Sequence, residues 1–232
     1  MSEPSSSLYV KNVIKLTFFK NRWVLAFYLC LFAVVILIST FIDYNGEFAD
    51  LFYLSFSNPL GILTSLFLHP NITNGIVNVV SAFFIVFTYL FVKALIDAYN
   101  IISSEGLTNY FILTPLLASI ASNFLIYVAM FLVEDYQSLQ FSGFQGVVQG
   151  LIGFMLSILL VAFLKVRNWS RHLPVFVALF LVTSVGYLML RSFLSGFNPS
   201  TLYDFSKLLS LQVAFFTGLT SLQIIRRKQK VG

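Results

Sequence analysis

The sequence predicts an all-α membrane protein, a polytopic bundle of six transmembrane helices with a membrane-dipping first loop. Of the 232 residues, 58% are hydrophobic and only 10% are charged, whereas soluble domains carry about 25% charged residues. A soluble core of this size cannot bury so much apolar surface. The composition therefore excludes a water-soluble enzyme, a disordered chain and a nucleic-acid binder. The net charge of +5 does not favour nucleic acid, because the location of charges matters more than their sum.

Six uncharged stretches approach the length of about 20 residues that a helix needs to cross the hydrocarbon core of a bilayer. Helices are the expected form, because a backbone in lipid must satisfy its own polar groups. We expect the transmembrane helices at residues 23–42, 72–92, 107–133, 136–164, 173–190 and 208–225. The Ser-rich residues 1–8, before the first of them, are expected to be disordered.

A seventh uncharged run covers residues 51–68. Asn58-Pro59 and Gly61 interrupt it, and these residues signal a turn rather than the interior of a helix. We therefore expect this run to dip into the membrane, or to lie at its surface, and to turn back before the second helix.

The basic residues predict the orientation of the bundle. With six spans, both termini lie on one side, and the opposite side holds only Arg191 and Lys207 among the 14 Lys and Arg residues. Cytoplasmic loops carry an excess of Lys and Arg, so both termini are expected in the cytoplasm. The expected organisation is a cytoplasmic segment at 1–22, a six-helix membrane domain at 23–225 and a basic cytoplasmic tail at 226–232.

Polar residues inside the expected spans are few, and each is costly in lipid. Asn74 and Asn78 are four positions apart, so they share one face of the second helix. Two interpretations remain open: interhelical hydrogen bonds that fix packing, or a polar cavity with a pair of hydrogen-bond donors. Gln145 and Gln149 lie one turn apart in the fourth span and leave the same choice open.

Small residues predict close contacts between helices. Four glycines follow one stripe of the fourth span: Gly143, Gly146, Gly150 and Gly153. Missing side chains allow a neighbouring helix to approach closely. Ala214 and Gly218 form a second small surface on the last span, and they are expected to pack against the fourth.

The sequence contains no pattern for a metal or a cofactor. No His, Cys, Asp or Glu residues have the spacing of metal ligands on a helix, and no glycine-rich phosphate loop is present. No carboxylate lies in the middle of an expected span, so a proton relay has no obvious carrier. A channel or transporter is the least favoured function class.

Two of these patterns resemble motifs of the rhomboid superfamily of intramembrane serine proteases. The second-helix pattern of that family is His-x4-His-x3-Asn, and it is matched here by His69, Asn74 and Asn78. The fourth-helix pattern is Gly-x-Ser-Gly, which corresponds to residues 143–146 with Gln145 in place of serine. The resemblance extends over residues 23–225.

The last-helix pattern of the family, His-x2-small-x3-Gly, corresponds to Leu211, Ala214 and Gly218. The resemblance implies a serine nucleophile where this chain has Gln145, and a histidine base where it has Leu211. A carboxamide is a poor nucleophile and leucine cannot accept a proton, so the catalytic dyad is missing. The combination is similar to a rhomboid pseudoprotease, in which the scaffold is kept without the chemistry.

Inactive members of the superfamily bind the transmembrane segments of other membrane proteins. The resemblance therefore implies a client site built from Asn74, Asn78, Gln145 and Gln149, with membrane lipids around it and with neither nucleic acid nor a small-molecule cofactor as partner. Two alternatives remain open: a structural subunit of a larger membrane complex, and an active intramembrane protease that uses other residues.

Overall fold

The structure is a computed structural model, and it describes residues 6–44, 48–69, 72–102, 106–132, 140–168, 172–174, 176–183 and 199–231. In these ranges the chain is helical, and the only strand-like features are two isolated bridges. Five helices are long and apolar enough to cross a membrane: Arg22–Ile42, Gly75–Ala98, Leu107–Leu132, Phe144–Val166 and Asp204–Ile225. The prediction of an all-α, multi-pass membrane protein is therefore confirmed at this level.

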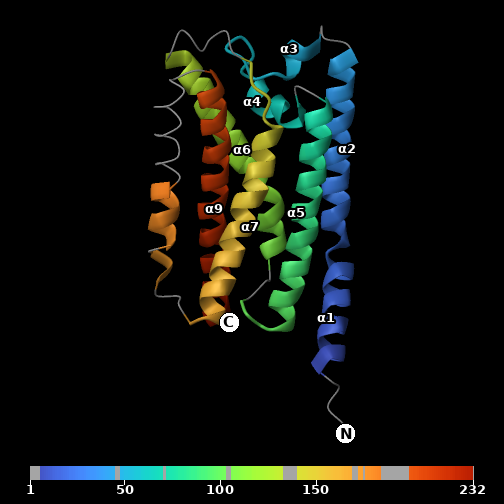
Figure 1. Ribbon diagram of the computed structural model, residues 1–232, viewed down its shortest axis with the longest axis vertical. Coiled ribbons are helices and arrows are strands. Elements are labelled where there is room, and N and C mark those ends of the chain that lie inside the picture. The colour runs from blue at the N-terminus through green and yellow to red at the C-terminus, as the bar shows by residue number, and fades with distance from the viewer. Residues whose placement is uncertain are drawn as a thin grey trace.

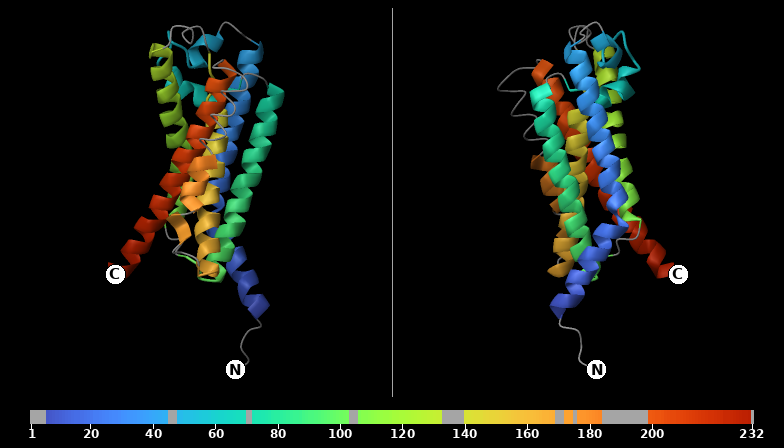
Figure 2. Two further views of the ribbon diagram at one scale, coloured as in Figure 1. Left: turned by 60° about the vertical axis from the view of Figure 1, so that its left-hand side comes forward. Right: turned by 90° about the vertical axis from the view of Figure 1, so that its right-hand side faces the viewer.

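Long helices run side by side along the vertical axis of the bundle (Figure 1). They are α1 (Ser6–Lys20), α2 (Arg22–Tyr44), α5 (Ile72–Ala98), α6 (Leu107–Leu132), α7 (Phe144–Val166) and α9 (Pro199–Val231). Three short helices gather at the upper end: α3 (Ala49–Phe52), α4 (Gly61–Thr64) and the 3-10 helix η2 (Ser65–Phe67). Figure 2 shows that α1 and the C-terminal part of α9 project from the opposite end. We call these the upper and lower ends.

Two predictions, the start of the fourth span and the disorder of the N-terminal residues, are wrong. The fourth span was expected from residue 136, but α7 begins at Phe144, because the Phe141 backbone instead pairs with Leu54 across the upper end. Disorder was expected for residues 1–8, but α1 begins at Ser6. Helix α1 is held by packing on α5, where the rings of Phe18 and Phe87 lie 5.7 Å apart.

The fifth expected span, 173–190, falls largely outside the described residues. Its described parts, 173–174 and 176–183, are helical. The tail 226–232 is helical as far as Val231, as the continuation of α9.

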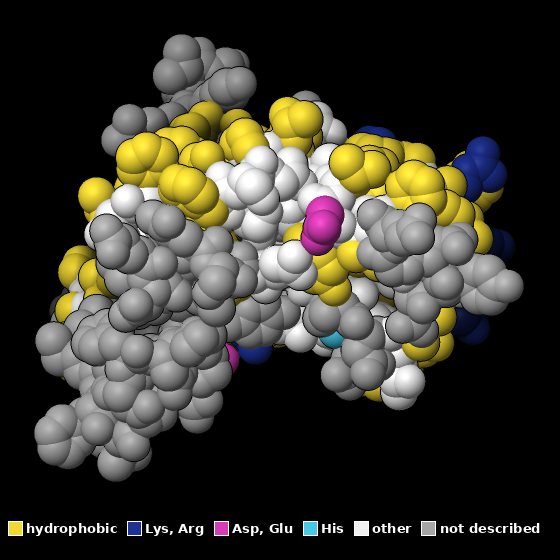
Figure 3. All heavy atoms as spheres, turned by 90° about the horizontal axis from the view of Figure 1, so that it is seen from above, with side chains coloured by type: hydrophobic (Ala, Val, Ile, Leu, Met, Phe, Trp, Pro, Cys, Tyr) yellow, Lys and Arg dark blue, Asp and Glu magenta, His cyan; other side chains and the backbone are white. Residues whose placement is uncertain are grey.

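The run 51–68 does not form a single membrane-crossing helix. The Asn58 side chain holds a turn there, because its Nδ2 donates to the carbonyls of Asp50, Leu51 and Tyr53 at 2.9, 3.1 and 2.9 Å. Leu60 is nevertheless 70% exposed. From above, hydrophobic side chains gather over the rim of this end, and Lys and Arg show only at the margin (Figure 3). An apolar rim of this kind suits contact with lipid.

Aromatic rings fill the centre of the bundle. The Tyr89 ring stacks on Phe111 with centroids 3.7 Å apart, and Phe154 meets the same phenylalanine edge-on at 5.9 Å. The Tyr28 hydroxyl donates to the Phe111 carbonyl at 3.0 Å, which satisfies a buried polar group. These contacts join α2, α5, α6 and α7 around one residue of α6.

The glycine stripe of α7 faces two neighbours. A Cβ on Gly150 would lie 2.8 Å from Pro115 Cα on α6, and one on Gly153 would overlap the Leu211 backbone on α9. The expected small surface on α9 lies in the same seam, where Gly218 contacts Ser157 of α7 and Ala214 is fully buried. The order of these contacts makes α7 antiparallel to α6 and parallel to α9.

Candidate polar site at the upper end

His69 is held between the short helices and α5. Its backbone N–H donates to Ser39 Oγ on α2 at 3.0 Å, and the residue is only 3% exposed. The ring packs over Gly75, whose missing side chain makes room for it: a Cβ there would lie 3.2 Å from the His69 Cβ. The chain therefore enters α5 with an imidazole fixed against its first turns.

Two carboxamides meet this imidazole. Asn78 Nδ2 lies 2.8 Å from His69 Nε2, and Gln145 Nε2 lies 3.3 Å from the same ring nitrogen. Both amides turn their NH₂ groups toward Nε2, which accepts from them in the tautomer that carries its proton on Nδ1. Gln145 Oε1 is buried and has no hydrogen-bond partner. We refer to His69, Asn78 and Gln145 as the upper cluster.

The start of α7, which positions Gln145, is fixed by neighbours on both sides. The Gly143 N–H donates to the Ser65 carbonyl of η2 at 2.8 Å, and the Ser119 hydroxyl of α6 donates to the Gly143 carbonyl at 3.0 Å. A Cβ on Gly143 would lie 2.9 Å from Ser65 Oγ, so a larger residue would push η2 away. The glycine thus permits the contact that brings Gln145 to His69.

Asn123 of α6 holds the short helices against the bundle. Its Nδ2 donates to the Ile62 carbonyl and to Ser65 Oγ, both at 3.1 Å. The serine that is held in this way also anchors the start of α7. Asn123 therefore positions the upper cluster without belonging to it.

The structure brings together some of the expected site residues and separates others. Asn78 and Gln145 meet, through His69, which the second-helix pattern included but which was not expected to be central. Gln149 is half-buried one turn further along α7 and is not among the groups that contact the imidazole. The Asn74 side chain lies outside the described residues. Leu211 contacts Gly153, two turns along α7 from Gln145.

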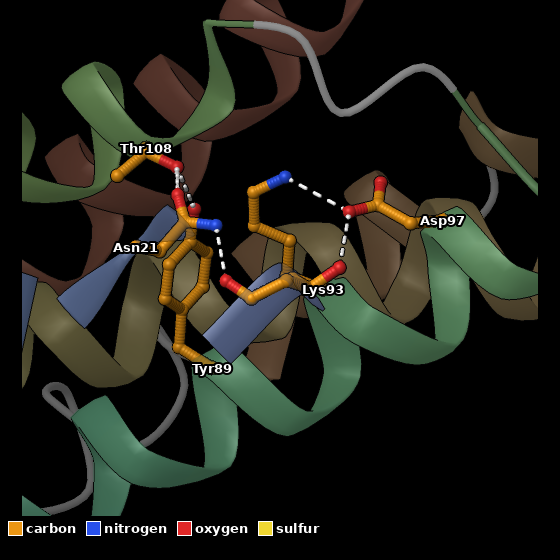
Figure 4. A network of polar contacts seen from close by, with 6 residues as sticks. Asn21, Tyr89, Lys93, Asp97 and Thr108 are labelled. Carbon is orange, nitrogen blue, oxygen red and sulfur yellow. Dashed lines mark hydrogen bonds and ion pairs between the residues drawn. The ribbon is translucent and has the colours of Figure 1, made fainter. Parts of the chain in front are cut away.

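A second polar group, the lower cluster, was not expected. Its members are Thr17, Asn21, Tyr89, Lys93, Asp97 and Thr108 (Figure 4). Lys93 was placed in a cytoplasmic loop and the spans were expected to hold no ionisable group, but α5 continues past this lysine and buries it to 7% exposure. The reason is pairing, because its ammonium lies 3.2 Å from the Asp97 carboxylate one turn later.

The lower cluster connects three helices. The Asn21 side chain, at the junction of α1 and α2, donates to the Thr17 carbonyl at 2.7 Å and accepts from the Thr108 hydroxyl of α6 at 3.0 Å. The Tyr89 hydroxyl of α5 donates to the same threonine at 3.2 Å. A chain of this kind satisfies polar groups that burial would otherwise penalise.

The upper cluster offers hydrogen bonding rather than metal chemistry. Within the described parts of the chain, no three His, Cys, Asp or Glu residues lie close enough to hold a metal ion. An imidazole and two carboxamides can exchange hydrogen bonds with a polar group that enters from the membrane. Comparison with protein-family models, with curated proteins and with solved structures finds no match.

Proposed function

We propose that the chain is a non-catalytic, rhomboid-like membrane protein that binds transmembrane segments of client proteins and influences their assembly, trafficking or degradation. The observation that carries the proposal is the upper cluster, in which His69, Asn78 and Gln145 meet. The resemblance implies that the same motif positions hold the catalytic site in rhomboid proteases. A carboxamide at position 145 replaces the nucleophile of that pattern.

The residues in the catalytic positions support binding without proteolysis. Gln145 has no hydroxyl or thiol to attack a peptide carbonyl, and Leu211 cannot remove a proton. Loss of the nucleophile removes the covalent route altogether. A fluorophosphonate probe that labels a serine of the folded protein would overturn this part of the proposal.

The proposal includes six crossings with both termini in the cytoplasm. Helices α7 and α9 run parallel, so the chain has to return to the upper end between Val166 and Pro199. This return supports the fifth span, expected at 173–190, as a crossing in addition to the five helices described above. The termini project from one end (Figure 2), and the Lys and Arg distribution favours the cytoplasm for that end.

Client binding follows from the contrast between the upper cluster and its surroundings. A transmembrane segment with a polar side chain, or with an unwound turn, has groups that lipid tails cannot satisfy. Such a segment gains hydrogen bonds at Asn78 and Gln145, both of which are only partly buried. A uniformly apolar helix gains nothing there, so the site discriminates by polarity.

Photocrosslinking tests the proposal. A benzophenone amino acid at position 149, half-buried one turn from Gln145, is expected to capture a synthetic 20-residue Leu/Ala helix with one central Gln in nanodiscs, and to capture the all-Leu/Ala helix more weakly. The matched control is the same amino acid at Leu159, an exposed position on α7. Equal capture from positions 149 and 159 would show that the cluster is not a binding site.

The alternative function is that of a structural subunit in a larger membrane complex. The observation that favours it is the number of large apolar side chains on the outside, among them Phe84 and Phe131, which are mostly exposed. Partner helices could cover these rings as well as lipid does. Co-purification of one protein in fixed stoichiometry, unchanged by Gln145→Leu, would favour this function over client binding.

A further inference from the structure

One atom of the upper cluster, an amide oxygen, has no hydrogen-bond partner. Gln145 Oε1 is buried, has no hydrogen-bond partner and can only accept. A buried acceptor without a donor has lost its hydrogen bond to water without gaining another in return. A donor that reaches this atom would recover that loss.

The donors of the cluster are already directed at the ring. The Asn78 and Gln145 amide nitrogens both point at His69 Nε2, at 2.8 and 3.3 Å. Both NH₂ groups therefore share the lone pair of His69 Nε2 as their acceptor. Gln145 is oriented with its nitrogen toward the imidazole and its oxygen away from it.

We infer that the upper cluster recognises its client through a hydrogen-bond donor, an N–H or O–H group of a transmembrane segment, which Gln145 Oε1 accepts. The inference rests on the proposed function and adds the chemical class of the partner. It also reverses the polarity of a protease oxyanion site, which donates hydrogen bonds to a developing negative charge.

The membrane itself supplies few competitors for this acceptor. Lipid tails have no polar groups, and the ester carbonyls beneath the headgroups only accept. Water is the main competing donor, and it is scarce inside the bilayer. Among client side chains, Ser, Thr, Asn, Gln, Trp and Lys carry donors, whereas an ether or a thioether does not.

A peptide pair that differs by one methyl group tests the inference. The probe is a lysine-flanked 20-residue Leu/Ala helix whose central residue is homoserine, compared with the same helix carrying O-methylhomoserine. The ether keeps an acceptor oxygen and loses the donor. Affinity for the full-length protein in nanodiscs is measured by fluorescence transfer from labelled peptide. We expect the homoserine helix to bind about threefold to tenfold more tightly.

Two variants locate the effect. Gln145→Met keeps the length of the side chain but has no amide oxygen, and it is expected to abolish the preference for homoserine. Gln149→Met, one turn away and similarly half-buried, is expected to keep it. Equal binding of both peptides to the natural protein, or a preference that survives Gln145→Met, overturns the donor inference while client binding stands. Failure of both peptides to bind overturns the proposed function and the inference together.

The protonation of His69 gives an independent check that needs no peptide. Nitrogen-15 NMR of histidine-labelled protein is expected to show the ring neutral, with its proton on Nδ1 and Nε2 accepting. A proton on Nε2 would reverse both amides, so that Gln145 offers its NH₂ to the client, and that result overturns the inference.

Discussion

Thr17 and Asp97 are joined by a hydrogen bond of 3.2 Å, although 80 positions separate them in the sequence. The bond ties α1 to the lower end of α5. The carboxylate oxygen that accepts it also lies 3.2 Å from the Lys93 ammonium. The same Asp97 oxygen therefore pairs with the buried Lys93 ammonium and accepts the hydrogen bond that attaches the N-terminal helix.

Asp97→Asn is expected to destabilise the protein by about 1–3 kcal/mol, because the buried Lys93 loses the negative charge beside it. Thermal unfolding in detergent measures the change. The matched control is Asp204→Asn, since Asp204 pairs with a more exposed lysine, Lys207, at 3.4 Å, and such pairs contribute little. An equal loss of stability in both variants would contradict the role of burial.

Gly146→Ala is expected to separate α6 from α7, because the new Cβ would overlap Ser119 Oγ. Overpacking of this kind typically costs about 1–3 kcal/mol. The second change Ser119→Ala removes the oxygen and is expected to restore part of the stability, even though the bond to the Gly143 carbonyl is lost. Additive destabilisation in the double variant would show that the two residues do not touch.

Asn58→Ala is expected to loosen the segment between α3 and α4, since three backbone carbonyls lose their shared donor. Hydrogen–deuterium exchange should then rise in peptides that cover residues 48–69 and stay constant in α7. Ser57→Ala is the control, because Ser57 is exposed and its hydroxyl bonds to the nearby Ser55 hydroxyl at 3.2 Å instead of to the backbone of the turn. Unchanged exchange in the Asn58 variant would mean that the turn is held by other contacts.

Gln145→Met is expected to raise the melting temperature of the client-free protein. The substitution removes a buried acceptor without a donor, at the cost of one long contact of 3.3 Å to His69. The expected gain is up to about 1 kcal/mol. Gln149→Met, without such an atom to remove, should change stability less. A clear loss of stability on Gln145→Met would show that the glutamine is a structural residue.

The sequence predicted the helical membrane class and most spans, because uncharged runs and helix length are local properties. The predictions were wrong where a contact between residues far apart in the sequence, or an ion pair along a helix, determines where a helix begins or ends. Phe141 belongs to the uncharged run that continues into α7, yet it pairs with Leu54 and stays outside the helix. Lys93 ends an uncharged run, but Asp97 one turn later allows the helix to continue and to bury the lysine.

The candidate site was predicted in part for the same reason. Spacing along a helix placed Asn74 and Asn78 on one face, and the motif pattern singled out Gln145. Neither could reveal that His69 joins them, because that contact depends on how η2 returns to α5. That Gln145 Oε1 is buried without a hydrogen-bond donor also depends on how the helices pack.

Helix α5 carries Asn78 near one end and Asp97 near the other, about five turns apart. A helix of this length turns as a rod, because twisting one end alone would break its backbone hydrogen bonds. The bond from Thr17 at the lower end thus acts, together with the packing of α5 on α1, α2 and α7, on the rotation of the helix that carries Asn78 to the imidazole above. The N-terminal helix thereby contributes to the geometry of a site at the opposite end of the bundle.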